Sequence, residues 1–236
     1  MTNWAAVQRA ARSDFTVAGV AQEELLRTYL PVMRGYLLGV RSVSPSNVDD
    51  LLQGFVADKM LRGGLFGKAD PSRGRFRNLL LKSLSNYLAS WFSRRSRDPT
   101  VLTDEGELPD LAVTTDQSAC FDWAWAHQTV LSAIEAMEGE CAKKGRMDVW
   151  EVFQGRIAHP AFDGLPEMPY GELVARLKLS SPRQAVDLLT TAKRMFRRCL
   201  RETIGWYAAG SEAVESEMGD LRSILARTRN LGGKPQ

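Results

Sequence analysis

Residues 76–95 read FRNLLLKSLSNYLASWFSRR. On a helical wheel, the bulky apolar side chains of this stretch share one stripe, which consists of Phe76, Leu80, Leu84, Leu88 and Trp91. The opposite face is polar and includes Lys82, Ser85 and Asn86. This pattern predicts a long amphipathic helix with Trp91 in the core.

The polar face and the basic end of this helix carry groups that bind nucleic acids. An amide hydrogen-bonds to a base edge, an aromatic ring stacks on a base, and guanidinium groups hold phosphates. Asn86, Tyr87, Arg94 and Arg95 are therefore expected to be free to meet a ligand. The competing interpretation is a core helix with a solvated basic end.

The remaining segments also have helical periodicity, and none has the alternation of a β-strand bounded by turns. Residues 98–118 are acidic and aperiodic and begin with Asp-Pro, which is typical of a linker. The expected fold is all-α, with two helical domains joined by a flexible acidic linker. The expected bounds are 1–97 for the first domain, 98–120 for the linker, 121–207 for the second domain, and 208–236 for an amphipathic helix with a disordered tail.

The charges are segregated along the chain. The net charge is only +3, from 31 Lys and Arg against 28 Asp and Glu. Between Lys59 and Arg97 the only acid is Asp70, residues 98–116 contain acids and no base, and residues 183–201 are basic again. This order predicts two anion-binding modules joined by an acidic segment.

Residues 170–196 read YGELVARLKLSSPRQAVDLLTTAKRMF. The apolar periodicity predicts a short helix over 170–177 and a second helix from about 182 to 207, separated by KLSS. In a DNA-binding helix-turn-helix the second helix enters the major groove. A plain helical hairpin explains this segment about equally well.

Other classes of protein have little support in the sequence. Two histidines and three widely spaced cysteines show no metal-ligand spacing and no disulfide framework, so no metal and no cofactor is expected. A small helical enzyme, metal-dependent or not, is the weakest interpretation because no nucleophile motif or phosphate-binding glycine loop is present. No apolar run approaches the roughly 20 residues of a membrane span, and the N-terminus lacks the apolar core of a signal peptide, so a cytoplasmic protein is expected.

The order of these parts resembles the ECF (extracytoplasmic function) group of bacterial RNA polymerase sigma factors. The resemblance is carried by VDDLLQGFVADKML at 48–61, GRFRNLLLKSLSNYLASWFSRR at 74–95, the acidic segment and the C-terminal helical pair, and it covers about residues 23–207. The N-terminal TNWAAVQRAAR is similar to the start of a divergent ECF-like branch.

The resemblance implies a sigma factor-like initiation protein without catalysis, whose partners are core RNA polymerase and promoter DNA. It implies that the first motif binds the clamp coiled coil of the β′ subunit through Asp49, Asp50, Leu52, Gln53 and Phe55. It places Asn86 near the minus-ten promoter element, so that the implied DNA contacts of this helix are Lys82, Asn86, Tyr87, Ser90, Arg94 and Arg95. The C-terminal pair is expected to bind the β flap and the minus-thirty-five element, with contacts from Arg183, Gln184, Thr190, Lys193, Arg194 and Arg197.

The chain departs from the family pattern in the C-terminal pair. Lys178 stands where relatives usually have glycine, one serine is inserted at 180–181, and Asp187 would face phosphate unfavourably. The basic residues of the second helix come late in it. A DNA-binding helix-turn-helix adaptor or regulator that is not a sigma factor therefore remains the alternative, and an anti-sigma or other regulatory partner is left open.

Overall fold

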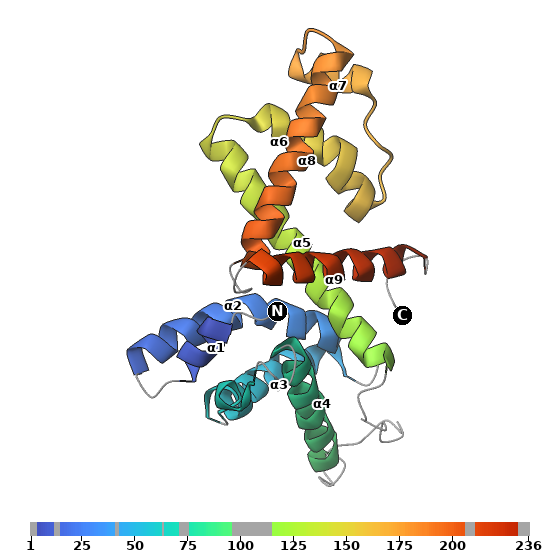
Figure 1. Ribbon diagram of the computed structural model, residues 1–236. Coiled ribbons are helices and arrows are strands. Elements are labelled where there is room, and N and C mark those ends of the chain that lie inside the picture. Colours follow the sequence, from blue (N-terminus) through green and yellow to red (C-terminus); the bar gives the residue numbers. More distant parts are fainter. Residues whose placement is uncertain are drawn as a thin grey trace. The chain divides into compact units, whose positions relative to one another are not determined.

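The computed structural model describes residues 4–11, 15–40, 43–62, 64–70, 76–95, 115–205 and 211–230 (Figure 1). Over these ranges all regular secondary structure is helical, which confirms the all-α prediction. None of the helices in them has the combination of length and apolar character that crossing a membrane requires. Residues 98–114, most of the expected linker, and the expected disordered end lie outside the described ranges.

The chain divides into two compact units. The first contains Met1–Gln128 and Ile204–Gln236, and the second contains Thr129–Thr203. These bounds differ from the expected ones, because α5 (Thr115–Lys143) is one continuous helix that begins inside the expected linker. The C-terminal helix α9 (Ser211–Asn230) also belongs to the first unit instead of forming a separate appendage.

The first unit is built from α1 (Trp4–Ala10), α2 (Phe15–Gly39), α3 (Val48–Phe55), α4 (Phe76–Arg95), the first half of α5, and α9. A π-helical segment, Val56–Leu61, continues α3, and single 3-10 turns lie at Pro45–Asn47 and Phe66–Lys68. Aromatic rings fill the core: Tyr29 meets Phe76 edge-on at 5.5 Å, and Tyr36 meets Phe121 at 5.6 Å.

Helix α4 buries a wider face than its apolar stripe predicts. Phe76, Leu80, Leu84 and Leu88 are buried as expected, but so are Leu81, Ser85 and Tyr87. Trp91, by contrast, is only half-buried, so its expected place in the core is wrong. The last turns of α4 extend beyond α2 and α3 (Figure 1), which leaves little protein to cover Trp91.

A buried guanidinium group joins three helices of the first unit. Arg77 on α4 is only 5% exposed, although it lies in the basic stretch that was expected to bind anions. Its side chain donates hydrogen bonds to Glu217 at 2.8 Å and to Asp220 at 3.2 Å on α9, and its Nε lies 3.6 Å from Asp122 on α5. We call these four residues the Arg77 cluster. The guanidinium carbon also lies 4.3 Å from the centre of the Trp125 ring, a cation–π contact.

The Arg77 cluster explains how α9 packs. The helical spacing of the apolar residues predicts that the face of this helix is made by Val214, Met218, Leu221 and Leu225. In the structure the buried residues are Ala213, Glu217, Met218, Leu221 and Ile224, whereas Leu225 is 39% exposed. The helix is rotated so that the Glu217 carboxylate reaches Arg77, because neither charge is tolerated in the interior without the other.

The second unit packs the remainder of α5 against α6 (Met147–Phe153), α7 (Tyr170–Leu177) and α8 (Pro182–Gly205). Its core contains Trp150, Phe153, Leu173, Ala185 and Cys199, among others. The three prolines of residues 159–169 predict a loop. Residues 159–163 instead extend a π-helical segment, Gln154–Asp163, which ends at the left-handed Gly164. Pro160 lies inside this segment.

We expect Arg77→Met to lower the free energy of unfolding by about 3–5 kcal/mol, because it leaves Glu217 buried without a counter-charge. Adding Glu217→Leu should recover much of this loss. The measurement is urea unfolding followed by circular dichroism. Arg27→Met is the matched control, because Arg27 forms an exposed pair with Glu23 and its loss should cost no more than about 0.5 kcal/mol. Equal effects of Arg77→Met and Arg27→Met would contradict the structural role of the cluster.

Candidate nucleic-acid interface

Helix α3 presents a small acidic surface. Asp49, Asp50 and Gln53 are exposed, and Asp49 accepts a hydrogen bond from Arg34 at 3.0 Å. The two acids lie in the first turn of the helix, where the helix dipole favours negative charge. Leu52 and Phe55, expected to be part of the same binding surface, are instead buried in the core. The surface available to a partner is therefore polar and consists of Asp49, Asp50 and Gln53.

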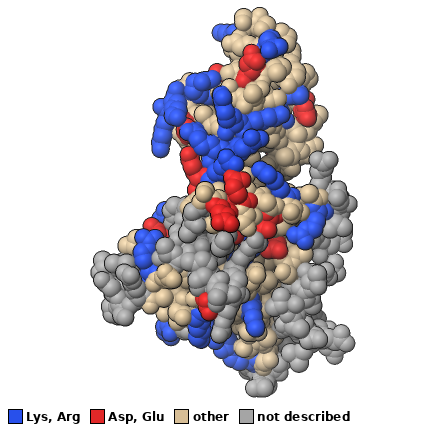
Figure 2. Space-filling model, in the orientation of Figure 1, with Lys and Arg blue, Asp and Glu red and all other residues tan. Residues whose placement is uncertain are grey.

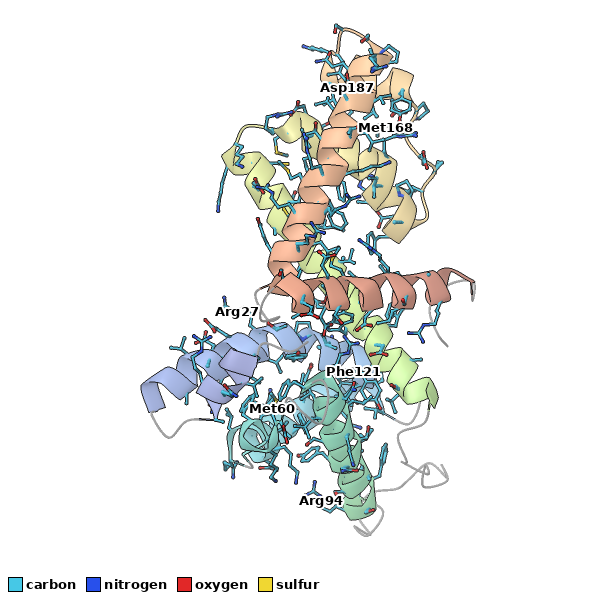
Figure 3. All side chains as sticks on the ribbon, in the orientation of Figure 1. Arg27, Met60, Arg94, Phe121, Met168 and Asp187 are labelled. Atoms are coloured by element: carbon cyan, nitrogen blue, oxygen red, sulfur yellow. The ribbon has the colours of Figure 1, made fainter. Side chains whose placement is uncertain are left out.

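Helix α4 displays a row of polar side chains along one side. Lys82, Asn86, Ser90 and Arg94 are all exposed and follow one another at intervals of four residues, so that each lies one turn beyond the last. We call these residues the α4 polar row. The Ser90 hydroxyl donates to the Asn86 backbone carbonyl at 3.0 Å, and the Asn86 side chain is exposed. Figure 3 shows Arg94 at the C-terminal end of α4.

Tyr87 is not part of this exposed surface, so the expectation that its ring stacks on a base is wrong. Its side chain is only 7% exposed and packs edge-on against Phe55, with ring centres 5.6 Å apart. Arg94 covers the ring from outside, with its guanidinium carbon 5.7 Å from the ring centre. The spacing of Tyr87 placed it at the margin of the apolar stripe, and the neighbouring helix α3 decides that it is buried.

The aromatic surface next to the basic end is made by Trp91 and Phe92 instead. Both are half-buried, and their rings meet edge-on at 5.1 Å. Arg95 lies over the Trp91 ring at 4.9 Å. The sequence contained one signal for this exposure, because Trp91 is the last apolar residue of the stripe and three of the next six residues are arginines.

Helices α7 and α8 are joined by four residues, 178–181. Lys178 has a left-handed backbone, with φ 52° and ψ 43°, and among the described residues it is the only one other than glycine with positive φ. This conformation ends α7 and lets the Leu179 N–H donate back to Val174 at 3.0 Å. Position 178 therefore requires the left-handed conformation, which glycine adopts at least cost. This agrees with the observation that Lys178 stands where the family usually has glycine.

The polar side chains in the first turns of α8 bind to neighbouring residues of the same segment. The Gln184 side-chain oxygen accepts hydrogen bonds from the Ser180 N–H and hydroxyl, both at 2.9 Å. Arg183 pairs with Asp187 at 3.5 Å, and the Thr190 hydroxyl donates to the Val186 carbonyl at 3.1 Å. These three bonded side chains, Arg183, Gln184 and Thr190, are the ones expected near the start of the second helix to bind DNA.

The later turns of α8 form a basic surface. Lys193, Arg194 and Arg197 are exposed, and we call them the α8 basic cluster. Figure 2 shows Lys and Arg side chains gathered in this part of the chain. The neighbouring Arg198 is bound instead to Glu140, and the Arg198 and Lys144 side chains lower the pKa of that carboxyl to about 2. Glu140 therefore stays ionised at neutral pH and keeps Arg198 engaged.

Comparisons with protein families, with curated proteins and with solved structures give no match to this chain. Within the described ranges, no three His, Cys, Asp or Glu side chains are grouped so that they could hold a metal ion. The case for function therefore depends on three surfaces: the exposed residues of α3, the α4 polar row with its neighbouring aromatic pair, and the α8 basic cluster.

We expect Gly54→Ala to destabilise the protein, because a Cβ at Gly54 would overlap the Tyr87 hydroxyl oxygen. Such overpacking costs about 1–3 kcal/mol. In a Tyr87→Phe background the nearest ring atom would lie 3.5 Å away, an ordinary contact, and the helical preference of alanine should then make the same change stabilising. Urea unfolding of the four proteins of this double-mutant cycle measures the coupling. Additive effects of the two changes would refute the buried position of the Tyr87 hydroxyl.

We expect Lys178→Gly to raise the free energy of unfolding by about 1 kcal/mol, because glycine adopts the left-handed backbone without a Cβ clash. Thermal unfolding measures the change. Lys178→Ala is the matched control, since it removes the same charge but keeps the Cβ and should give no gain. An equal gain in both variants would assign the effect to charge and contradict the backbone argument.

Proposed function

We propose that this protein is a sigma factor-like transcription initiation protein, which binds core RNA polymerase and directs it to promoters. The observation that carries the proposal is the α4 polar row beside a half-buried aromatic pair at a basic helix end. This surface offers an amide for a base edge, rings for stacking, and guanidinium groups for phosphates. These are the groups that hold an unpaired DNA strand.

Two other surfaces support the proposal. The exposed acids and amide of α3 lie on the motif whose likeness to sigma factors implies contact with the β′ clamp coiled coil. The α7–α8 pair is joined by a short turn with a left-handed residue, and its second helix carries a basic cluster, which favours duplex DNA as its ligand. We assign the strand-opening role to the first unit and contact with duplex DNA and the β flap to the second.

In this proposal the residues for polymerase are Asp49, Asp50 and Gln53, without the buried Leu52 and Phe55. The residues for the promoter strand are Lys82, Asn86, Ser90, Arg94 and Arg95, with Trp91 in place of Tyr87 as the stacking ring. Trp91 has the better position because it is partly exposed whereas Tyr87 is buried, and Arg95 lies over the Trp91 ring.

The second candidate is a DNA-binding adaptor that does not engage polymerase. The observation that favours it is the α8 basic cluster, which explains DNA binding without any role for α3.

A role as an enzyme has less support. Burial raises the pKa of the Cys199 thiol to about 11 and also raises that of Cys141, so neither is a thiolate nucleophile at neutral pH.

Combining Asp50→Ala with Gln53→Ala should weaken binding to core polymerase by about 2–4 kcal/mol, the range of a hot-spot pair. The measurement is a fluorescence anisotropy titration of the labelled full chain with core polymerase. Both side chains are exposed, so the fold should be unaffected.

The matched control combines Gln8→Ala with Glu23→Ala, which removes the same two chemical groups from exposed positions on α1 and α2. Wild-type affinity in the control and reduced affinity in the α3 variant support a sigma factor-like role. If the unaltered chain has no affinity for core polymerase and still binds DNA, the adaptor is the correct function.

A further inference from the structure

We propose that α8 anchors the protein to the phosphate backbone of duplex DNA without reading its base sequence. This inference rests on the proposed function and specifies it: the α7–α8 pair supplies affinity, and promoter choice is left to the first unit. The helical pair would then act as a sequence-independent clamp for duplex DNA.

The first step of the argument concerns the side chains that would enter the groove. In a helix-turn-helix, residues near the start of the second helix contact base edges. Here the Gln184 side-chain oxygen already accepts two hydrogen bonds from Ser180. Withdrawing Gln184 to bind an adenine would leave the Ser180 N–H without its partner and loosen the start of α8, where the Gln184 N–H also bonds the Ser181 hydroxyl at 3.4 Å.

The other two groups near the start of α8 are also engaged. Arg183 is paired with Asp187 on the next turn, and the carboxylate of Asp187 would be repelled by the phosphates beside a groove. The hydroxyl of Thr190 is bonded to the Val186 carbonyl. Figure 3 shows Asp187 near the N-terminal end of α8, where a base-reading helix would need donors.

The second step concerns the α8 basic cluster. Lys193 follows Gln184 by nine residues, which is about 13.5 Å along a helix axis. The major groove is about 8.5 Å deep, so a helix that entered it end-on by its first turn would hold the cluster beyond the groove, beside the backbone. In this end-on docking the cluster is therefore placed for phosphates and not for bases.

The third step concerns how strongly the affinity for DNA should depend on salt concentration. Three cations that each neutralise one phosphate give a dependence of log affinity on log salt with a slope of about −2.7. Such binding is the same for every sequence, because phosphate contacts carry no base information. Removing two of the three cations should therefore change the slope and leave sequence preference untouched.

The test uses the full chain and fluorescently labelled duplexes of unrelated sequence, titrated between 50 and 400 mM salt. Combining Arg194→Gln with Arg197→Gln should weaken binding to every duplex by the same factor and reduce the magnitude of the slope by about 1.8. The control combines Arg27→Gln with Arg222→Gln, which removes the same charge from exposed positions on other helices and should leave the slope unchanged.

A second measurement tests base readout directly. A randomised duplex library is selected with the wild-type chain, with Thr190→Val and with Gln184→Ala. We expect the three selections to yield the same sequences. A motif that is enriched by the wild type and lost in either variant would overturn the inference and restore α8 as a reader of duplex sequence.

The inference and the proposed function fail in different ways. Polymerase binding that depends on Asp50 and Gln53, together with an unchanged salt slope in the Arg194 and Arg197 variant, would overturn the inference alone. A slope reduced as expected in a chain without affinity for polymerase would overturn the sigma factor-like function alone. Loss of polymerase affinity without loss of DNA affinity in the arginine variant would assign the cluster to a protein partner and overturn the inference.

Discussion

The pairing of Arg77 with Glu217 is the interaction on which the first unit depends. A guanidinium group and a carboxylate that are 5% and 2% exposed must satisfy each other, because either one alone in the interior would cost several kcal/mol. The pair joins α4 to α9, and Asp122 and Trp125 bring α5 to the same point. Packing of apolar side chains tolerates small rotations of a helix, whereas this set of directed contacts does not.

The contacts of Arg77 fix the rotation of α4 about its axis, and this rotation also determines which residues lie on its exposed face. With Arg77, Leu84 and Leu88 directed inward, the α4 polar row faces outward. Tyr87 is then directed at Gly54, where only a residue without a side chain leaves room for the Tyr87 hydroxyl. The candidate strand-binding surface and the buried ion pair thus lie on opposite faces of α4. The contacts of Arg77 on the buried face set the direction in which the α4 polar row points.

The sequence predicted the helices well and their contacts poorly, for a physical reason. Helical periodicity is local, so the positions of α4, α7 and α8 follow from a few neighbouring residues. The partner of Arg77 lies 140 residues away, and nothing in the local pattern distinguishes Glu217 from a solvated acid. Local periodicity places an acid such as Glu217 at the surface, because its counter-charge is not visible in the neighbouring sequence. The buried face of α9 therefore differs from the face that apolar spacing predicts.

The start of α5 shows a related limit of prediction from amino-acid composition. Asp116 contributed to the acidic composition that indicated a linker, yet it lies in the first turn of α5. Acids are favoured both in solvated linkers and at helix N-termini, so composition alone does not separate the two. Among the candidate site residues, exposure of the α4 polar row follows from its spacing, whereas the engagement of Gln184 with Ser180 depends on a turn geometry that spacing does not describe.

The division of the chain into units has a consequence for synthesis on the ribosome. The second unit is continuous, from Thr129 to Thr203, so all of its core is present once those residues have emerged. The first unit includes α9, which follows the second unit in the sequence, so its interior is completed only after the second unit has been made. Until α9 is made, Arg77 has neither Glu217 nor Asp220 as a partner, so the residues that precede the second unit complete their packing after it.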